Sequence, residues 1–125
     1  LEGRCKNGWF IEPTVIEGLN NKNKLNQEEI FGPLVTLQTF KTEEDAIEIA
    51  NDTGFGLSAT IWTKSNEKSR RVAKKIDAGV IWINCWMVRD LRTPLGGLKN
   101  SGLGREGGKS IFRFFTEQKN ICEIR

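Results

Sequence analysis

Three short runs of apolar and β-branched residues are separated by two stretches with helical periodicity. The runs predict strands at residues 34–40, 57–63 and 80–84. The third run is apolar on both faces, as expected of a strand buried between helices. A strand-helix-strand-helix-strand order with short links favours right-handed crossovers and parallel pairing. The pattern therefore predicts an α/β fold with three layers, α/β/α, around a small, mostly parallel sheet.

The two helical stretches begin with residues that suit a helix N-terminus. Thr42 can cap the first helix, whose first turn is acidic where the helix dipole is positive. Ser65 or Asn66 can cap the second helix, and Gly79 stands where a left-handed residue could end it. These signals predict that the helices are the crossovers between the three strands.

The residue composition and the periodicity of the chain change after Asn84. The glycine-rich stretch 85–108 has neither a helical nor a strand period, which predicts a long ordered loop. A last helix is expected to open at Glu106 or Gly108, and the final residues, 120–125, predict a strand with no partner inside the chain. The sequence thus predicts one domain, or a piece of a larger one, in three parts, residues 1–84, 85–108 and 109–125.

Composition places the chain among ordinary globular proteins. Of its 125 residues, 38% are hydrophobic and 28% charged, and the net charge of +3 is too mild to favour a nucleic-acid partner. No apolar run approaches the roughly 20 residues that a membrane helix needs. No signal peptide is evident at the N-terminus, so a cytoplasmic location and no membrane partner are expected.

The three cysteines lie far apart, and the chain contains no histidine. This composition argues against a zinc site and removes Cys-His and Ser-His-Asp catalysis, so no metal is expected. Cys85 follows the third predicted strand, where a thiolate could attack a carbonyl. Because no activating neighbour is adjacent, the role of a small buried hydrophobic side chain is favoured over a nucleophilic one.

The segment 28–33, Glu-Glu-Ile-Phe-Gly-Pro, combines two carboxylates, a ring and a turn. A carboxylate such as that of Glu29 can hold a ribose diol, and the ring of Phe31 offers an apolar face to a flat heterocycle. These are the contacts that a nicotinamide nucleotide needs. The alternative is a charged turn before a strand, with Phe31 filling a core.

Residues 102–107 match the dinucleotide fingerprint GxGxxG. That motif works where a strand meets a helix, and no strand is predicted to precede it here, so we favour glycines that let the loop cross close to other backbone.

Arg89 and Arg92 flank Asp90 in the same loop. An arginine there could clamp a substrate carboxylate or form a local ion pair with Asp90, and the sequence leaves both interpretations open.

Four motifs, taken in order, resemble the C-terminal part of the catalytic domain in the aldehyde dehydrogenase superfamily. They are GWFIEPTV at 8–15, QEEIFGP at 27–33, AGVIWIN at 78–84 and PLGGLKNSGLGRE at 94–106. Within the superfamily, NCWMVRDLR at 84–92 is similar to the muconic semialdehyde dehydrogenase branch. The resemblance covers essentially the whole chain.

The resemblance implies NAD(P)-dependent oxidation of an aldehyde to a carboxylic acid, with a muconic-type semialdehyde as one candidate. Glu29 corresponds to the residue that holds the nicotinamide ribose, and Phe31 to the ring beside the nicotinamide. The residues that correspond to the substrate pocket are Trp86, Met87, Arg89 and Leu95. Arg89 is expected to receive the substrate's carboxylate, and Leu95 replaces the usual phenylalanine.

The family's cysteine nucleophile and glutamate base have no counterpart in these residues, so no catalytic residue is assigned. NAD or NADP is the expected cofactor of the family, with weak or no binding by this chain alone. Two functions follow: the C-terminal segment of a dehydrogenase, inactive by itself, or a stand-alone non-catalytic module. The resemblance also implies a homo-oligomer formed through an oligomerisation strand at 120–125, or association with a full-length or N-terminal counterpart.

Overall fold

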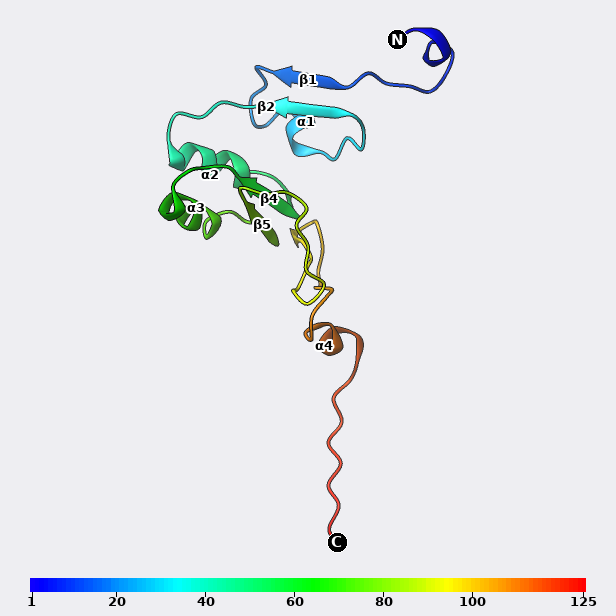
Figure 1. Cartoon of the computed structure of the whole chain (residues 1–125), viewed down its shortest axis with the longest axis vertical. Helices are drawn as coiled ribbons and strands as arrows, with labels where there is room; N and C mark the ends of the chain where they lie inside the picture. Colours follow the sequence, from blue (N-terminus) through cyan, green and yellow to red (C-terminus); the bar gives the residue numbers. More distant parts are fainter. The chain divides into compact units, whose positions relative to one another are not determined.

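The computed structural model describes residues 1–125, which form two compact units, Leu1–Thr53 and Gly54–Arg125. Each unit mixes helices and short strands (Figure 1). The elements of the first unit are η1 (Gly3–Cys5), β1 (Thr14–Glu17), α1 (Lys24–Gln27), β2 (Leu34–Leu37) and α2 (Glu43–Asn51). The elements of the second are β3 (Phe55–Gly56), β4 (Ser58–Ile61), α3 (Asn66–Ala73), β5 (Val80–Ile83), β6 (Leu98–Lys99) and α4 (Ile111–Phe115).

In the first unit, β1 and β2 form a parallel pair with Thr14 opposite Leu34. The polar segment before α1 is held by Asn21, whose amide nitrogen donates to the Asp52 carboxylate at 2.7 Å. Its side-chain oxygen accepts from Gln38 at 3.0 Å and its carbonyl from Gln27 at 2.6 Å. These bonds tie the connection between the strands to the end of α2, which satisfies backbone groups that the loop would otherwise leave unpaired.

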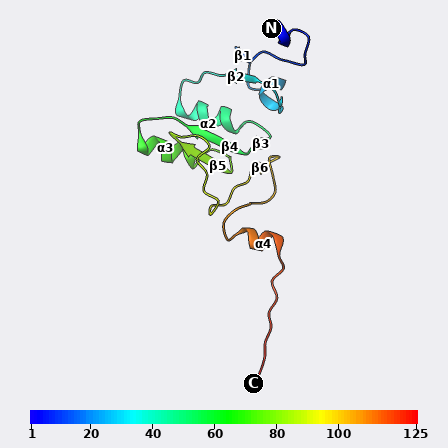
Figure 2. The same cartoon turned by 45° about the vertical axis from the view of Figure 1, so that its right-hand side comes forward.

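In the second unit, β4, α3 and β5 form a βαβ unit, with β4 and β5 paired in parallel and Ser58 opposite Val80. The short strands β3 and β6 pair in the antiparallel sense, with Gly56 opposite Leu98 (Figure 2). The predicted strands therefore exist, but hydrogen bonds join the strands in three separate pairs rather than in one sheet.

The predicted helix caps are confirmed. Thr42 and Asp45 form a capping box at the start of α2, in which the Thr42 hydroxyl accepts from the Asp45 N–H at 3.0 Å. Ser65 accepts from the Lys68 N–H at the start of α3. The prediction that Gly79 caps α3 was wrong, because this helix ends at Ala73 and Lys74 is its C-cap. Gly79 is required for another reason: a Cβ there would lie 1.6 Å from the Gly96 carbonyl oxygen.

Two predictions for the last third of the chain need correction. The final helix is shorter than expected, since α4 begins at Ile111 rather than at Glu106 or Gly108. Residues 120–125 form no strand within this chain, because no segment pairs with them. A strand is defined by its hydrogen-bonded partner, so an extended pattern alone does not produce one.

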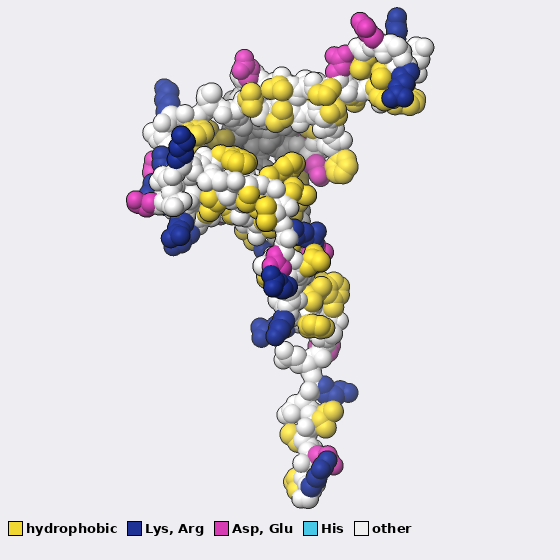
Figure 3. All heavy atoms as spheres, in the orientation of Figure 1, with side chains coloured by type: hydrophobic (Ala, Val, Ile, Leu, Met, Phe, Trp, Pro, Cys, Tyr) yellow, Lys and Arg dark blue, Asp and Glu magenta, His cyan; other side chains and the backbone are white.

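Apolar side chains remain at the surface of both units. No hydrophobic side chain is fully buried, and Ser69 is the one buried polar residue. Figure 3 shows apolar atoms on the faces of β1 and β2 and along the second unit down to its C-terminal end. No helix has the length and apolar character needed to cross a membrane.

Candidate functional site

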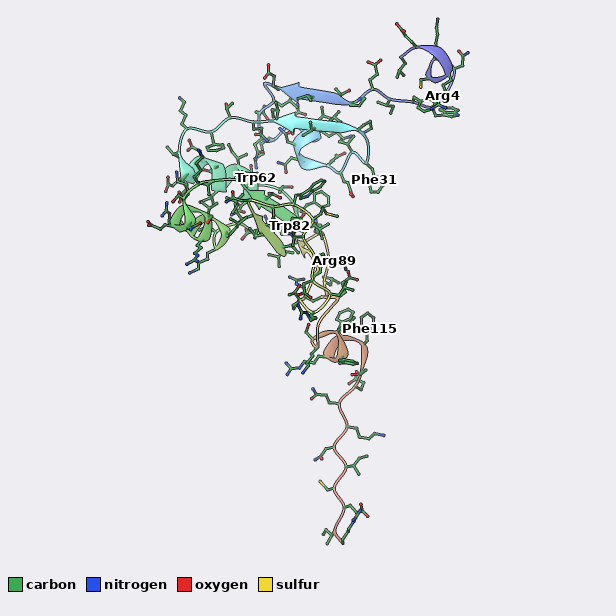
Figure 4. All side chains as sticks on the ribbon, in the orientation of Figure 1. Arg4, Phe31, Trp62, Trp82, Arg89 and Phe115 are labelled. Carbon is green, nitrogen blue, oxygen red and sulfur yellow. The ribbon has the colours of Figure 1, made fainter.

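The 28–33 segment lies between α1 and β2 in the first unit. Phe31 adopts φ = 54°, in the left-handed region that a bulky residue rarely enters. Its side chain is 92% exposed and stands clear of the ribbon (Figure 4). The segment is anchored at its end, where the Leu34 N–H donates to the Gly32 carbonyl and the Thr14 N–H to the Pro33 carbonyl, both at 2.8 Å. The alternative interpretation, in which Phe31 fills a core, is therefore not supported in this chain.

Glu29 and Phe31 line the same open groove, of about 380 Å³, between the end of α1 and β2. The carboxylate of the neighbouring Glu28 lies 3.5 Å from the Lys24 ammonium. The Glu29 carboxylate has no hydrogen-bond or ion-pair partner in the chain and remains exposed. A free carboxylate beside an exposed ring fits a ribose diol joined to a flat base, because the carboxylate offers two acceptor oxygens.

The 85–108 loop of the second unit begins after Asn84, whose side chain forms two hydrogen bonds with the Thr63 backbone, here called the Asn84 clasp. The Asn84 side chain accepts from the Thr63 N–H and donates to the Thr63 carbonyl, both at 2.8 Å. Asn84 has φ = 52°, which an asparagine tolerates better than most residues. The indole N–H of Trp82 then donates to the Val88 carbonyl at 2.8 Å. The start of the loop is therefore fixed to the ends of β4 and β5.

A second set of contacts closes the loop on itself. Leu95 and Glu106 form an antiparallel bridge, with N–H···O distances of 2.7 and 2.8 Å. The Arg105 guanidinium donates to the Gly97 carbonyl at 2.7 Å and to the Gly104 carbonyl at 2.8 Å. The Gly108 N–H donates to the Leu91 carbonyl at 2.9 Å. Hydrogen bonds within the loop therefore hold it, and the loop also contains the short strand β6, which its sequence pattern does not predict.

The two arginines of the loop have different partners. The Arg92 guanidinium holds both carboxylate oxygens of Asp90, at 2.6 to 3.1 Å. The Arg92 side chain and then its backbone N–H lower the pKa of the Asp90 carboxyl, and Asp90 raises the pKa of Arg92. The local ion pair predicted for this loop therefore belongs to Arg92, which leaves Arg89 free of Asp90.

Arg89 instead donates from Nη2 to the Glu106 Oε1 at 2.6 Å. Both side chains are about half exposed (Figure 4 labels Arg89). Since this contact uses one of five donors, the rest of the guanidinium remains available to a second carboxylate.

Trp86 and Met87 present exposed side chains, with 69% and 65% of their surface accessible. Met87 has φ = 58°, so it and Phe31 share the strained left-handed conformation. Leu95 lies elsewhere, in a depression of about 310 Å³ that also contains Phe114 and Phe115. The second unit thus links Arg89 to Leu95 through Glu106, whereas no hydrogen bond or ion pair joins either of them to Trp86 or Met87.

Cys85 is half-buried rather than buried, and the structure contains no group of three or more His, Cys, Asp or Glu side chains that could hold a metal ion. Two of the 102–107 glycines serve close packing: a Cβ on Gly104 would lie 2.6 Å from the Phe114 ring, and one on Gly107 2.5 Å from the Thr93 carbonyl oxygen. Asn84 and Glu106 are not among the predicted site residues. An amide at the end of a strand is a signal for Asn84, whereas nothing in the local sequence links Glu106 to Arg89.

The sequence and the structure of the chain were compared with those of known proteins. The family model described as "Aldehyde dehydrogenase family" matches residues 1–121. The chain belongs to this family. A 2-aminomuconic semialdehyde dehydrogenase of Danio rerio is 50% identical over 114 residues, which are 91% of the chain and 23% of that protein. A 2-hydroxymuconic semialdehyde dehydrogenase of Pseudomonas sp. (strain CF600) is 48% identical over 115 residues, 92% of the chain and 24% of that protein.

Solved aldehyde dehydrogenases share the fold. A Mycobacterium tuberculosis aldehyde dehydrogenase complexed with NAD+ superposes with a TM-score of 0.87 at 44% identity, over 95% of this chain and 24% of that one. A P. syringae indole-3-acetaldehyde dehydrogenase in complex with NAD+ gives 0.84 at 44% identity, over 88% and 22%. These likenesses confirm the α/β class and an aldehyde dehydrogenase catalytic domain. The chain spans about a quarter of the length of the relatives it matches.

Proposed function

We propose that these 125 residues are the C-terminal segment of an NAD(P)-dependent aldehyde dehydrogenase and supply part of its nicotinamide site and aldehyde pocket. The observation that carries the proposal is the free Glu29 carboxylate beside the exposed Phe31 ring, in a chain of this family. Glu29 would accept hydrogen bonds from the nicotinamide ribose, and the Phe31 ring would lie beside the nicotinamide. When bound, NAD(P) supplies the hydride acceptor.

The 85–108 loop would supply the substrate contacts. Trp86, Met87 and Leu95 offer apolar surface for the aldehyde, and Arg89 offers a guanidinium with unused donors. A guanidinium binds a carboxylate in a planar, bidentate manner, which suits an aldehyde that carries an acid group. The muconic semialdehyde dehydrogenases among the relatives support this substrate class.

We infer that residues outside these 125 supply the nucleophile and base. Aldehyde oxidation through a thiohemiacetal needs an activated thiolate and a base that deprotonates water. None of the three cysteines has a basic side chain as a hydrogen-bond partner, since the one bond from a cysteine side chain joins Cys122 to Asn120. The chain alone is therefore expected to be inactive and to bind NAD or NADP weakly. Its predicted cytoplasmic location stays a prediction.

The test compares the pure 125-residue chain with the complete polypeptide that carries these residues. Both are incubated with NAD or NADP and a panel of aldehydes, and reduced nicotinamide is followed. We expect turnover by the complete polypeptide and none by the chain alone. Turnover by the pure chain would overturn the assignment of the nucleophile to other residues.

A second candidate function is a stand-alone, non-catalytic module that binds a copy of itself, a full-length relative or an N-terminal counterpart. It is favoured by residues 117–125, which form no strand pair with the rest of the chain. In this segment Ile121 and Ile124 are 81% and 101% exposed. Mass analysis of the protein in its native cells separates the two functions. A species of 14.1 kDa supports the module, and a larger polypeptide supports the dehydrogenase.

A further inference from the structure

We infer that Glu106 positions Arg89 for the carboxylate of the substrate and is therefore a determinant of specificity for acid-bearing aldehydes. This inference rests on the proposed function. It assigns to Glu106 a role in holding another side chain, without direct contact with the reacting atoms.

The first observation is the way in which Glu106 is fixed. Its backbone N–H and carbonyl both pair with Leu95, at 2.8 and 2.7 Å. The next residue back along the chain, Arg105, is held by the Gly97 and Gly104 carbonyls. The position from which the Glu106 side chain extends is therefore set by backbone contacts that do not depend on that side chain.

The second observation is the geometry of the ion pair. One oxygen of Glu106 accepts from Nη2 of Arg89 at 2.6 Å, across a separation of 17 residues in sequence. A single contact to one end of the guanidinium orients its plane while leaving Nε and Nη1 unused. A long side chain that would otherwise sample many rotamers is thus held in one direction before the substrate arrives.

The third observation is the contrast with Arg92. Its guanidinium is occupied by both oxygens of Asp90, and Asp90 also accepts from the Arg92 backbone N–H at 2.9 Å. Such a pair is complete and has little capacity for another carboxylate. Of the two arginines, only Arg89 is both oriented and available.

The experiment uses two aldehydes of equal length in the complete polypeptide: 6-oxohexanoate, which carries a distal carboxylate, and hexanal, which does not. We expect Glu106→Ala to raise the KM for 6-oxohexanoate roughly three- to fivefold, as for a partly exposed ion pair. The KM for hexanal and kcat for both should stay within about twofold. Glu106→Gln keeps an acceptor oxygen and should restore part of the loss.

Asp90→Asn is the matched control, because it weakens the other carboxylate–arginine pair of the same loop and should leave both KM values unchanged. In an Arg89→Ala background, Glu106→Ala should have no further effect on 6-oxohexanoate. An equal rise in KM for both aldehydes would show a merely structural role and overturn the inference. A fall in KM for 6-oxohexanoate would make Glu106 a competitor of the substrate and would also overturn it.

If the complete polypeptide oxidises neither aldehyde, the proposed function fails, and the inference is judged by calorimetric binding of adipate, an unreactive dicarboxylate. Glu106→Ala and Arg89→Ala should then both weaken adipate binding, while Asp90→Asn should not. Adipate binding that is indifferent to Glu106, or no adipate binding at all, would overturn the inference.

Discussion

The 28–33 segment and the 85–108 loop both present exposed side chains, but they are supported in opposite ways. The loop is tied by the Asn84 clasp, the Trp82 bond, the Leu95–Glu106 bridge and two arginine–carboxylate pairs. The 28–33 segment is held only at its two ends, where the Glu28 N–H donates to the Lys24 carbonyl and where the chain enters β2, and the Glu29 carboxylate between them has no partner. The substrate-side contacts are thus organised before binding, whereas the cofactor-side contacts depend on groups that the ligand or other residues supply.

The largest loss of stability is expected from a substitution that disrupts the packing of the 85–108 loop against the rest of the second unit. A methyl group on Gly79 would lie 1.6 Å from the Gly96 carbonyl oxygen, so one of the two backbones must move. We expect Gly79→Ala to lower the free energy of unfolding by about 3 kcal/mol or more, as for severe overpacking. Urea unfolding of the complete polypeptide measures it.

The matched control substitution is Gly32→Ala, in the 28–33 segment. A Cβ on Gly32 would meet nothing closer than 4.0 Å, at Ile30. Gly32→Ala should therefore change the free energy of unfolding by no more than about 0.5 kcal/mol. Equal losses for the two substitutions would remove the distinction between a packed loop and a loosely held segment.

A smaller effect is expected at the clasp that begins the loop. Asn84→Ala removes both bonds to Thr63 and places an alanine at φ = 52°, which together should cost about 2 kcal/mol. Asn84→Gly removes the same bonds without the backbone strain and should cost less. If the two variants lose equal stability in urea unfolding, the left-handed backbone contributes nothing to the clasp.

These contacts explain which parts of the structure could be predicted. Thr42 and Ser65 were identifiable because a cap acts within three or four residues, so its signal is local. Gly79 was assigned to the wrong role because the same local signal fits a helix end, while the contact that requires it comes from Gly96. The pairing of β1 with β2 likewise depends on residues distant in sequence.

The candidate site residues also divide into those with a local sequence signal and those that depend on residues distant in sequence. The motifs around Glu29, Phe31 and Arg89 pointed to a family and therefore to candidate roles. The partner of Arg89 could not be predicted, since Asp90 was nearer in sequence and Glu106 approaches only through the bridge to Leu95. Local charge patterns identify which groups need partners, and the fold decides which partners they find.

The smallest losses of stability are expected at the helix N-caps, one in each unit. Thr42 is part of a reciprocal capping box, whereas Ser65 accepts one hydrogen bond. Thr42→Ala should lower the free energy of unfolding by about 1 kcal/mol, and Ser65→Ala by somewhat less. Urea unfolding measures both, and a larger loss for Ser65→Ala would contradict the ranking.

The pH dependence of α2 follows from the same capping box. Hydrogen bonds from the Thr42 backbone, the Thr42 hydroxyl and the Lys41 backbone lower the pKa of the Asp45 carboxyl below its ordinary value of 3.8. Its stabilising contribution is therefore present above that value and is lost as the pH falls through the lowered pKa. Acid unfolding followed by circular dichroism should show a smaller pH dependence in Asp45→Asn, and an unchanged dependence would contradict this.

The central claim is that Glu29 holds the nicotinamide ribose, and its neighbour Glu28 provides the control. The two carboxylates are adjacent in sequence and line the same groove, but Glu28 lies beside Lys24 and Glu29 is free. In the complete polypeptide, steady-state kinetics should show that Glu29→Gln lowers kcat/KM for NAD(P) by about tenfold, as for loss of a charge-assisted hydrogen bond. Glu28→Gln should leave it within about twofold. Equal values for the two variants would contradict the assignment of the cofactor contact to Glu29.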